Sequence, residues 1–345
     1  MVEMSGAIDQ ATPSAAPERS PLLSVRGLTT EFKVDHGVVR AVDGVSFDVE
    51  RGEILGVVGE SGCGKSVTAL SILGLLPAPR GRIVAGSVML GGKDLTRLTE
   101  AQMRHVRGNR IAMIFQDPMT SLNPYLKVGE QLAEVCELHL GLSRRECWER
   151  AVALLERVRI PDPLKRAHQY PHELSGGMRQ RAMIAMALLC EPELLIADEP
   201  TTALDVTIQA QVLELLLELC SERHLSVMLI THDMRVVAST CTRVMVMYAG
   251  RIVESAPTPA LFDTPGHPYT RALLRSIPRA DRRDKGPLFA LEGLPPRLDQ
   301  GRFQACTFAP RCAFRRPACL AGEPELAARE PGRSARCILS TEELS

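Results

Sequence analysis

The chain has 345 residues, enough for one large domain with a smaller appendage or for two domains. Its 41 basic and 41 acidic side chains cancel, which argues against nucleic acid as a partner, and no apolar run is long enough to span a bilayer. Residues 1–21 lack the basic and apolar regions of a signal peptide, so we expect a disordered tail and a cytosolic chain.

The first predicted elements are strands. Residues 22–49 contain four short runs of alternating or β-branched residues: Leu22–Val25, Thr29–Val34, Val38–Val42 and Val45–Val49. The continuous apolar run Ile54–Val58 predicts a buried strand. A helix is expected over Val67–Leu76, where Pro77 ends it, and further strands over Val84–Leu90 and Ile111–Phe115.

A phosphate-binding loop joins the buried strand to the first helix. Residues 59–66 match G-x-x-x-x-G-K-[ST] in the required strand-to-helix context, which makes a chance glycine loop a weak alternative. Backbone N–H groups would surround the β- and γ-phosphates, Lys65 would add a positive charge, and the Ser66 hydroxyl would reach Mg²⁺. The predicted nucleotide contacts are Gly59, Ser61, Gly62, Cys63, Gly64, Lys65 and Ser66.

A second anion site is predicted where a long helix begins. Residues 117–180 are mostly helical in pattern, which indicates an inserted helical subdomain. Near its end, Ser175, Gly176 and Gly177 combine a capping hydroxyl, close backbone approach and free N–H groups. A helix-capping turn is the plain alternative. One nucleotide does not need two phosphate cradles from the same subunit.

Polar side chains follow several predicted strands. Asp198 and Glu199 end the apolar strand Leu194–Ala197, where Asp198 would reach Mg²⁺ and Glu199 would act as general base on water. His232 ends another strand, and we expect it to contact the γ-phosphate and hold Glu199. Gln116 follows a fourth strand and would coordinate Mg²⁺ through its amide oxygen. A solvated turn and a structural histidine are the alternatives, and the nearby phosphate loop weakens both.

The remaining elements alternate between helix and strand, which predicts a mainly parallel sheet with helices on its faces. From about Pro257 the composition becomes rich in Pro, Arg and Cys, so we place a small accessory domain at 257–345. Four cysteines there follow the pattern Cys306-x5-Cys312-x6-Cys319-x17-Cys337. Four thiolates suit a [4Fe–4S] cluster or zinc, although the tight C-x2-4-C knuckle typical of zinc is absent. A third interpretation is that the four thiols bind no metal.

In order and spacing, these motifs resemble ABC-transporter ATPase domains over residues 22–255. The resemblance implies a P-loop α/β nucleotide-binding domain at 22–256 with a helical subdomain at about 117–180. Met178 stands where the family's signature usually has Gln. The resemblance further implies that Ser175, Gly176 and Gly177 bind the γ-phosphate of an ATP held by a partner subunit. Asp205 would lie across the dimer seam, and Phe32 would stack on adenine unless it belongs to the core.

A narrower resemblance rests on Gln116–Pro124 and Gly266–Thr270, which look like the ATPase subunits of oligopeptide/dipeptide permeases, including relatives that import nickel. It implies ATP- and Mg²⁺-dependent import of peptides, and a structural [4Fe–4S] cluster on the C-terminal cysteines, with zinc as the lesser alternative. The expected partners are a second, non-identical ATPase, two membrane-spanning permease subunits and an extracytoplasmic substrate-binding protein. The chain would work at the cytoplasmic face of the inner membrane.

Two other functions are considered. A soluble ABC ATPase of DNA repair or translation would usually carry a long coiled-coil insertion or two cassettes, and neither is present in the sequence. A partner with a degenerate site is disfavoured because Lys65, Asp198, Glu199 and His232 are all in place. The segment Gln116–Pro124 would either dock on a permease or only cap the next helix. We expect no residue of this chain to contact the transported cargo, so the sequence does not identify it.

Overall fold

Five parallel strands form the centre of the larger sheet. The computed structural model describes residues 20–35, 37–116, 121–201, 206–277, 291–296, 298 and 303–344, without the side chains of 206 and 207. The strands are β3 (Ile54–Val58), β6 (Ile111–Ile114), β7 (Leu194–Asp198), β8 (Ser226–Ile230) and β9 (Arg243–Tyr248). Their order is β9-β3-β8-β7-β6. Because they run parallel, their carboxyl ends meet at one edge of the sheet.

A second, antiparallel sheet precedes the phosphate loop. It has the order β2-β1-β4-β5 and consists of β1 (Leu23–Val34), β2 (Gly37–Val49), β4 (Gly81–Leu90) and β5 (Lys93–Asp94). The four short strands expected over residues 22–49 are therefore two long ones. The pairing register of β1 with β2 shifts between Val25 and Leu28 and between Leu28 and Thr30. Gly27 and Gly44 have positive φ at these irregularities, so they mark bulges within strands instead of turns between them.

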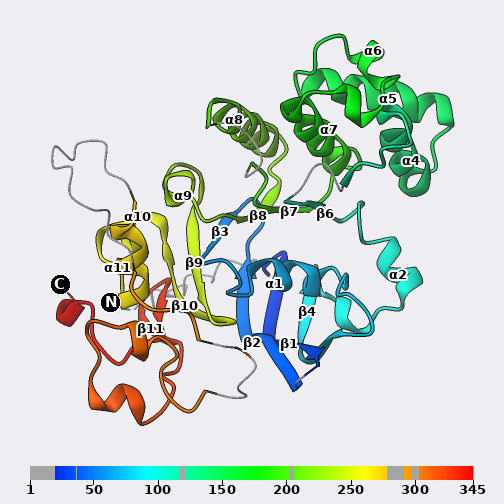
Figure 1. Ribbon diagram of the computed structural model, residues 1–345. Coiled ribbons are helices and arrows are strands. Elements are labelled where there is room, and N and C mark those ends of the chain that lie inside the picture. Colours follow the sequence, from blue (N-terminus) through cyan, green and yellow to red (C-terminus); the bar gives the residue numbers. More distant parts are fainter. Residues whose placement is uncertain are drawn as a thin grey trace, which may run out of the picture.

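Two apolar cores lie on opposite faces of the parallel sheet. Leu55, Val57 and Ile196 belong to the core shared with the antiparallel sheet and helix α1 (Lys65–Ile72). The alternate residues Val58 and Leu195 belong to the core shared with the other helices. Strands buried on both faces explain why these segments are continuous apolar runs. Helix α1 contacts strands of both sheets, which places the phosphate loop between them (Figure 1).

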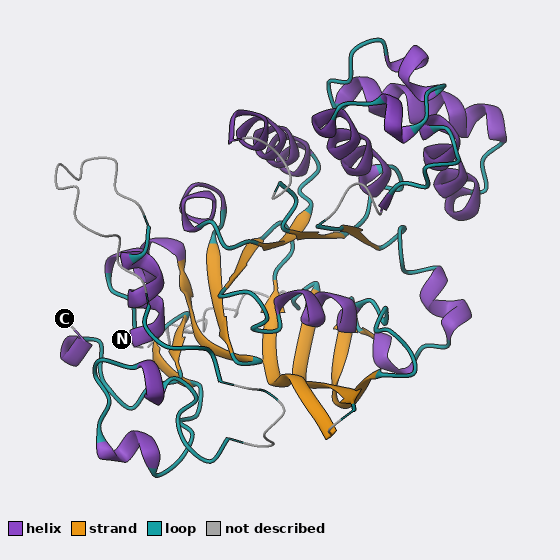
Figure 2. Cartoon of the chain, in the orientation of Figure 1, coloured by secondary structure: helices purple, strands orange, loops and turns teal. Residues whose placement is uncertain are grey.

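Four helices form a group at one end of the parallel sheet, where the last of them along the chain contacts the edge strand β6 (Figure 2). They are α4 (Val128–Leu140), α5 (Arg144–Arg157), α6 (Pro163–Ala167) and α7 (Gly176–Leu188). Gly141 ends α4 in the left-handed conformation, and Ser143 begins α5 with a capping box to Glu146. The short connection leaves α4 and α5 packed together, with Cys136 and Cys147 buried.

The remaining helices cover the sheets or their connections: α2 (Glu100–Arg104), α8 (Val206–Glu222), α9 (Met234–Thr240), α10 (Thr258–Asp263) and α11 (Pro268–Arg275). Single 3₁₀ turns occur at η1 (Leu95–Arg97), η2 (Pro171–Glu173), η3 (Ala309–Arg311), η4 (Pro317–Leu320) and η5 (Glu342–Leu344). Within the described part of the chain, no helix combines the length and apolarity needed to cross a membrane.

The C-terminal segment extends the larger sheet. Strand β10 (Arg251–Pro257) pairs antiparallel with β9, and β12 (Arg333–Ala335) pairs antiparallel with β10. Strand β11 (Ala327–Glu330) adds to β12 at the sheet edge. Residues 327–335 are therefore hydrogen-bonded into the same sheet as the phosphate-loop strand β3, which brings the cysteine-rich segment close to that loop.

Candidate active site

The phosphate loop lies between β3 and α1, as the motif predicts. Gly64 is the residue before α1 and has a φ of 106°. A Cβ atom at Gly64 would lie 2.5 Å from the carbonyl oxygen of Ala41, and one at Gly59 would overlap the carbonyl of Met247. Backbone from two neighbouring segments thus closes on the loop, so that only glycine fits at both positions.

The cationic residue of the loop is folded against the loop itself. The Nζ atom of Lys65 donates to the carbonyl oxygens of Gly59 and Glu60 at 2.8 and 3.0 Å. Lys65 is 5% exposed, and the buried thiol of Cys63 lies 3.9 Å from its Nζ. Its ammonium group is therefore held inside the loop by neutral acceptors, where an anionic phosphate would be a stronger partner.

The Asp198 carboxylate, at the end of β7, is a candidate Mg²⁺ ligand. Burial raises its pKa, while a hydrogen bond from Ser66 and the charge of Lys65 oppose that shift. Its Oδ1 atom is buried without a hydrogen-bond partner among the described residues. An unpartnered carboxylate oxygen beside a serine hydroxyl is a donor set that suits Mg²⁺. The residues present therefore fit the ion.

Two predicted residues, each from a strand end, converge on the carboxylate of a third, Glu199. The Nε2 atom of Gln116 donates to Oε2 of Glu199 at 3.1 Å, and Nδ1 of His232 lies 3.3 Å from Oε1 of Glu199. Glu199 has a φ of 46°, and its N–H donates to the carbonyl oxygen of Ile230 at 2.9 Å. A non-glycine residue in this conformation is typical of functional sites, where the surroundings hold it in place.

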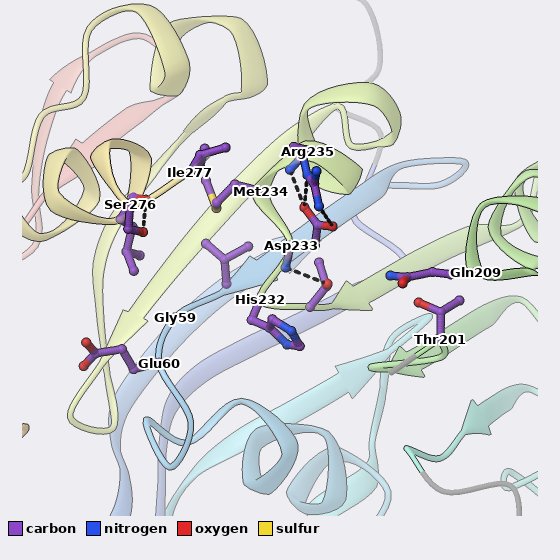
Figure 3. Close-up of a pocket in the computed structure, with 13 residues that line it drawn as sticks. Gly59, Glu60, Thr201, Gln209, His232, Asp233, Met234, Arg235, Ser276 and Ile277 are labelled. Atoms are coloured by element: carbon purple, nitrogen blue, oxygen red, sulfur yellow. Dashed lines mark hydrogen bonds and ion pairs between the residues drawn. The ribbon is translucent and has the colours of Figure 1, made fainter. Parts of the chain in front are cut away.

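A cavity of about 460 Å³ opens beside these residues. Gly59 and Glu60 line one side of it, and Thr201 lies on the other side of His232 (Figure 3). Asp233 accepts from the N–H of Arg235 at 2.9 Å and from its guanidinium at 3.2 Å, which fixes the turn that carries His232. The cavity thus joins the phosphate loop to the histidine.

The second anion site lies on another part of the molecule. Ser175 precedes α7 and accepts from the N–H of Met178 at 3.3 Å, so the capping role is present. Helix α7 packs with α4 and α5, apart from α1 (Figure 1). Within one chain, Ser175 and the glycines after it therefore belong to a different element group from the phosphate loop.

The two remaining nucleotide contacts predicted from the sequence are Phe32 and Asp205. Phe32 is half-buried in β1, and its ring lies against Gly81 of the paired strand β4, where an added Cβ would come within 2.8 Å of Cε1. This contact with the sheet is compatible with the core alternative, and stacking on adenine stays a prediction. Asp205 lies outside the described residues.

The four C-terminal cysteines line one small cavity, together with apolar side chains such as Phe308 and Leu339. Burial raises the pKa of Cys306 to about 11, and it also raises the pKa of Cys312 and Cys337. Within the described residues, no three His, Cys, Asp or Glu side chains are placed to hold a metal ion. The thiols thus share a cavity without forming a metal site, so both the cluster and zinc stay predictions.

Comparison with known proteins identifies the family. Residues 42–202 match the ABC transporter family, and residues 253–319 match the C-terminal region of oligopeptide/dipeptide transporters. The chain is 56% identical over 326 residues to a probable peptide ABC transporter ATP-binding protein of Sinorhizobium fredii, covering 94% of this chain and 97% of the relative. The chain belongs to the ATP-binding subunits of the oligopeptide/dipeptide ABC transporter family. The resemblance found in the sequence is confirmed.

Other members of this ABC family have about half of their aligned residues in common with this chain. The oligopeptide transport ATP-binding protein AppD of Bacillus subtilis is 50% identical, with 94% of this chain and 98% of the relative covered. The dipeptide transport ATP-binding protein DppD of Escherichia coli is 49% identical, with coverages of 92% and 96%. Relatives of nearly the same length thus align over almost the whole chain.

Solved structures support the ABC ATPase fold. A dimeric ATP-binding cassette bound to ADP and phosphate matches with a TM-score of 0.62 and 26% identity, covering 68% of this chain and 98% of that one. The ABC transporter component cbiO1 of Clostridium perfringens matches with a TM-score of 0.59 and 27% identity, covering 70% and 90%. The P-loop α/β fold expected from the sequence is confirmed.

Two contacts of the phosphate loop in this ABC ATPase are absent from the sequence-based prediction. The hydroxyl of Tyr269 accepts from the N–H of Glu60 at 2.8 Å, and Arg311 forms an ion pair with the Glu60 carboxylate at 2.7 Å. Tyr269 lies in Gly266–Thr270, which the sequence singled out only as a family motif. Arg311 carries no local signal apart from its position next to Cys312.

Proposed function

We propose that this ABC ATPase hydrolyses ATP to drive the import of peptides. The observation that carries this proposal is the Glu199 carboxylate, held between Gln116 and His232 beside the phosphate loop. The names of the relatives, which include oligopeptide and dipeptide transport proteins, support peptides as cargo. The hydrolytic site and the cargo are thus supported by separate observations.

The residues have distinct roles in hydrolysis. The phosphate-loop amides bind the β- and γ-phosphates, and Lys65 exchanges its carbonyl partners in the loop for phosphate oxygens. Ser66, Asp198 and the amide oxygen of Gln116 would hold Mg²⁺, and the hydrogen bond between Ser66 and Asp198 supports two of these ligands. When bound, Mg²⁺ neutralises phosphate charge. Glu199 takes the proton from the attacking water, while His232 and Gln116 orient its carboxylate.

The second anion site completes a partner's nucleotide site. Ser175, Gly176 and Gly177 lie at the start of α7, in an element group apart from α1, so they are available to an ATP held by another subunit. We assign helices α4–α7 as the helical subdomain that carries this site, and Asp205 to the dimer seam. The dimeric form of a solved ATP-binding cassette supports this arrangement. A non-identical second ATPase is the proposed partner.

The membrane partners would dock near the start of α4. Tyr125 is 86% exposed and Leu126 is 38% exposed, so two apolar side chains lie at the surface after Pro124. Asn123 also accepts from the N–H of Tyr125 at 3.0 Å, which supports the local turn. The residue before α4 is Lys127, so Asn123 does not cap this helix, and docking is the role that we propose for the segment. Two permease subunits and an extracytoplasmic binding protein complete the importer, with this chain at the cytoplasmic face of the inner membrane.

The cysteine-lined cavity is proposed to take a [4Fe–4S] cluster with a structural role. The donor set supports it, since all four thiols line the cavity and backbone N–H groups of Arg316 and Leu339 approach two sulfurs at 3.4 and 3.5 Å. The cluster would supply a covalent crosslink between turns with little regular structure. Ligation requires deprotonation of thiols whose pKa is raised.

Iron analysis after anaerobic purification tests the cluster. We expect a coloured protein containing equal amounts of iron and labile sulfide, and loss of both in Cys319→Ser. Cys220→Ser is the matched control, because this buried thiol lies in α8 outside the cavity. A colourless, zinc-loaded protein would contradict the proposal.

Reconstitution tests the transport function. The chain is co-expressed with its membrane-spanning partners, purified as a complex and placed in vesicles with the binding protein. We expect ATP-dependent uptake of labelled peptides that Lys65→Ala abolishes. Uptake of Ni²⁺ without peptide uptake would support the nickel importer instead, and failure to co-purify with any membrane-spanning chain would favour a soluble ABC ATPase.

A further inference from the structure

An ion pair joins the C-terminal segment to the phosphate loop. The guanidinium of Arg311 donates to both carboxylate oxygens of Glu60, at 2.7 and 2.9 Å, across 251 positions of sequence. Glu60 directly follows the first glycine of the loop. A two-pronged pair of this kind fixes direction as well as distance, so it constrains the orientation of the Glu60 side chain.

The surroundings of Arg311 make this pair an internal one. Its side chain is 5% exposed, against 26% for Glu60. The Nη1 atom also donates to the hydroxyl of Tyr248 at 3.3 Å, and Nε donates to the carbonyl oxygen of Glu292 at 3.1 Å. Every one of these acceptors is neutral except Glu60. The Glu60 carboxylate is thus the counterion in these contacts, and its removal would leave a buried charge unpaired.

The backbone of Glu60 is held from the same side. Its N–H donates to the hydroxyl of Tyr269 at 2.8 Å. Tyr269 packs on Tyr248 and Phe308, with ring centroids 4.6 and 5.4 Å away, and all three side chains are fully or almost fully buried. Both the side chain and the backbone of Glu60 are therefore bound by residues from the C-terminal third of the chain.

We propose that Arg311 is a positioning residue for ATP binding, which orders the phosphate loop through Glu60. This inference rests on the ATPase function proposed above. The loop contains Gly59, Gly62 and Gly64, all at positive φ, so fixing it costs more conformational entropy than fixing an ordinary loop. Because Glu60 is anchored before the nucleotide binds, the loop loses less conformational entropy on ATP binding. Arg311 thus strengthens ATP binding without contacting ATP.

Steady-state kinetics on the intact transporter complex test the inference. We expect Arg311→Met to raise the KM for ATP about tenfold and to change kcat less than threefold, because a preordered loop contributes to binding rather than to the chemical step. Glu60→Gln should have the same effect, and Arg311→Lys, which keeps the charge but not the two-pronged geometry, an intermediate one. The double variant should be no worse than the more affected single variant.

Arg316→Met is the matched control. Arg316 is paired with Glu343 at 2.8 Å in the same segment, but its side chain is 53% exposed and the pair does not involve the loop. We expect wild-type kinetics for it. Wild-type KM in both Arg311→Met and Glu60→Gln, or additive effects in the double variant, would overturn the inference. If Arg311→Met does not fold, Glu60→Gln and Arg311→Lys decide.

A second measurement separates this inference from the proposed function. The rise in Tm that Mg-ATP produces reports binding and needs no hydrolysis. We expect this rise to shrink in Arg311→Met and Glu60→Gln but not in Arg316→Met. A wild-type complex that binds ATP without hydrolysing it would contradict the proposed function, while the Tm series would still decide on Arg311.

Discussion

The Nδ1 atom of His232 lies 3.3 Å from Oε1 of Glu199, although 33 positions separate the two residues along the chain. They follow neighbouring strands, since β7 pairs in parallel with β8. Glu199 is largely buried while His232 is 62% exposed. The histidine lines the cavity and is the more solvent-exposed member of the pair.

Replacing Glu199 with Gln should separate binding from hydrolysis. The amide keeps the size of the side chain but cannot accept a proton, so we expect ATP binding to persist and kcat to fall by about 10²-fold or more. ATP binding is measured by the rise in Tm, and hydrolysis by phosphate release from the complex. Undiminished turnover would remove Glu199 from the role of general base.

His232→Ala should lower kcat because the Glu199 carboxylate loses a side-chain partner that helps to orient it. We expect a fall of about 10- to 10³-fold with a small change in KM, and a partial recovery in His232→Gln, which retains a hydrogen-bond donor. Arg235→Ala is a control in the same turn, since its guanidinium pairs with Asp233. Equal losses in all three variants would mean that the turn, and not the histidine, matters.

Asp198→Asn should make the nucleotide-free protein more stable and inactive. Burial raises the pKa of Asp198, and its Oδ1 atom has no hydrogen-bond partner among the described residues, so the charge is held at a cost to folding. We expect a gain of about 1 kcal/mol in the free energy of unfolding without nucleotide, together with loss of Mg²⁺-dependent ATP hydrolysis. Chemical denaturation measures the first effect, and a loss of stability would contradict a net cost of burying this carboxylate.

Gly64→Ala should abolish ATP binding. A Cβ at this position would come within 2.5 Å of the Ala41 carbonyl oxygen, so the loop or its neighbour must move. Gly141→Ala is the matched control: it also has positive φ, but an added Cβ meets nothing within 4 Å. That variant should lose only about 1–2 kcal/mol of stability and keep ATP binding. Nucleotide binding in Gly64→Ala, measured by the rise in Tm, would argue against a closed loop.

His267 should make folding sensitive to acid. Complete burial lowers the pKa of His267 to about 3, so the imidazole stays neutral in the folded protein. In the unfolded chain it becomes protonated once the pH falls below its ordinary pKa of about 6.5. Because the unfolded state binds more protons, stability falls as the pH drops from about 6.5 toward 3. Between pH 7 and pH 5 the expected loss is about 2 kcal/mol. Nδ1 accepts from the N–H of Tyr269 at 3.1 Å, an interaction that His267→Asn retains. Equal pH dependence in both proteins, by chemical denaturation, would exclude His267.

The predicted site illustrates which parts of a fold are local. The phosphate loop and the acidic pair after β7 are each a short contiguous segment of the sequence. Apolar runs in the sequence predict the strands and the helix that flank them. Gln116, Glu199 and His232 each follow a strand, and the parallel order of these strands brings their side chains to one edge of the sheet. The breaks at Gly27 and Gly44 predict separate short strands, whereas the structure has bulges within long strands, because a glycine between short apolar runs has the same pattern in both cases.

The sequence by itself determined the ATP-binding chemistry and the family of this protein, because the groups that touch phosphate lie within short motifs whose spacing is fixed by secondary structure. Only the tertiary structure decided how the C-terminal segment contacts the phosphate loop. The pairing of β12 with β10 and the ion pair of Arg311 with Glu60 join residues far apart along the chain. Neither contact leaves a periodic pattern in the sequence, because each depends on which surfaces the packed sheet brings together.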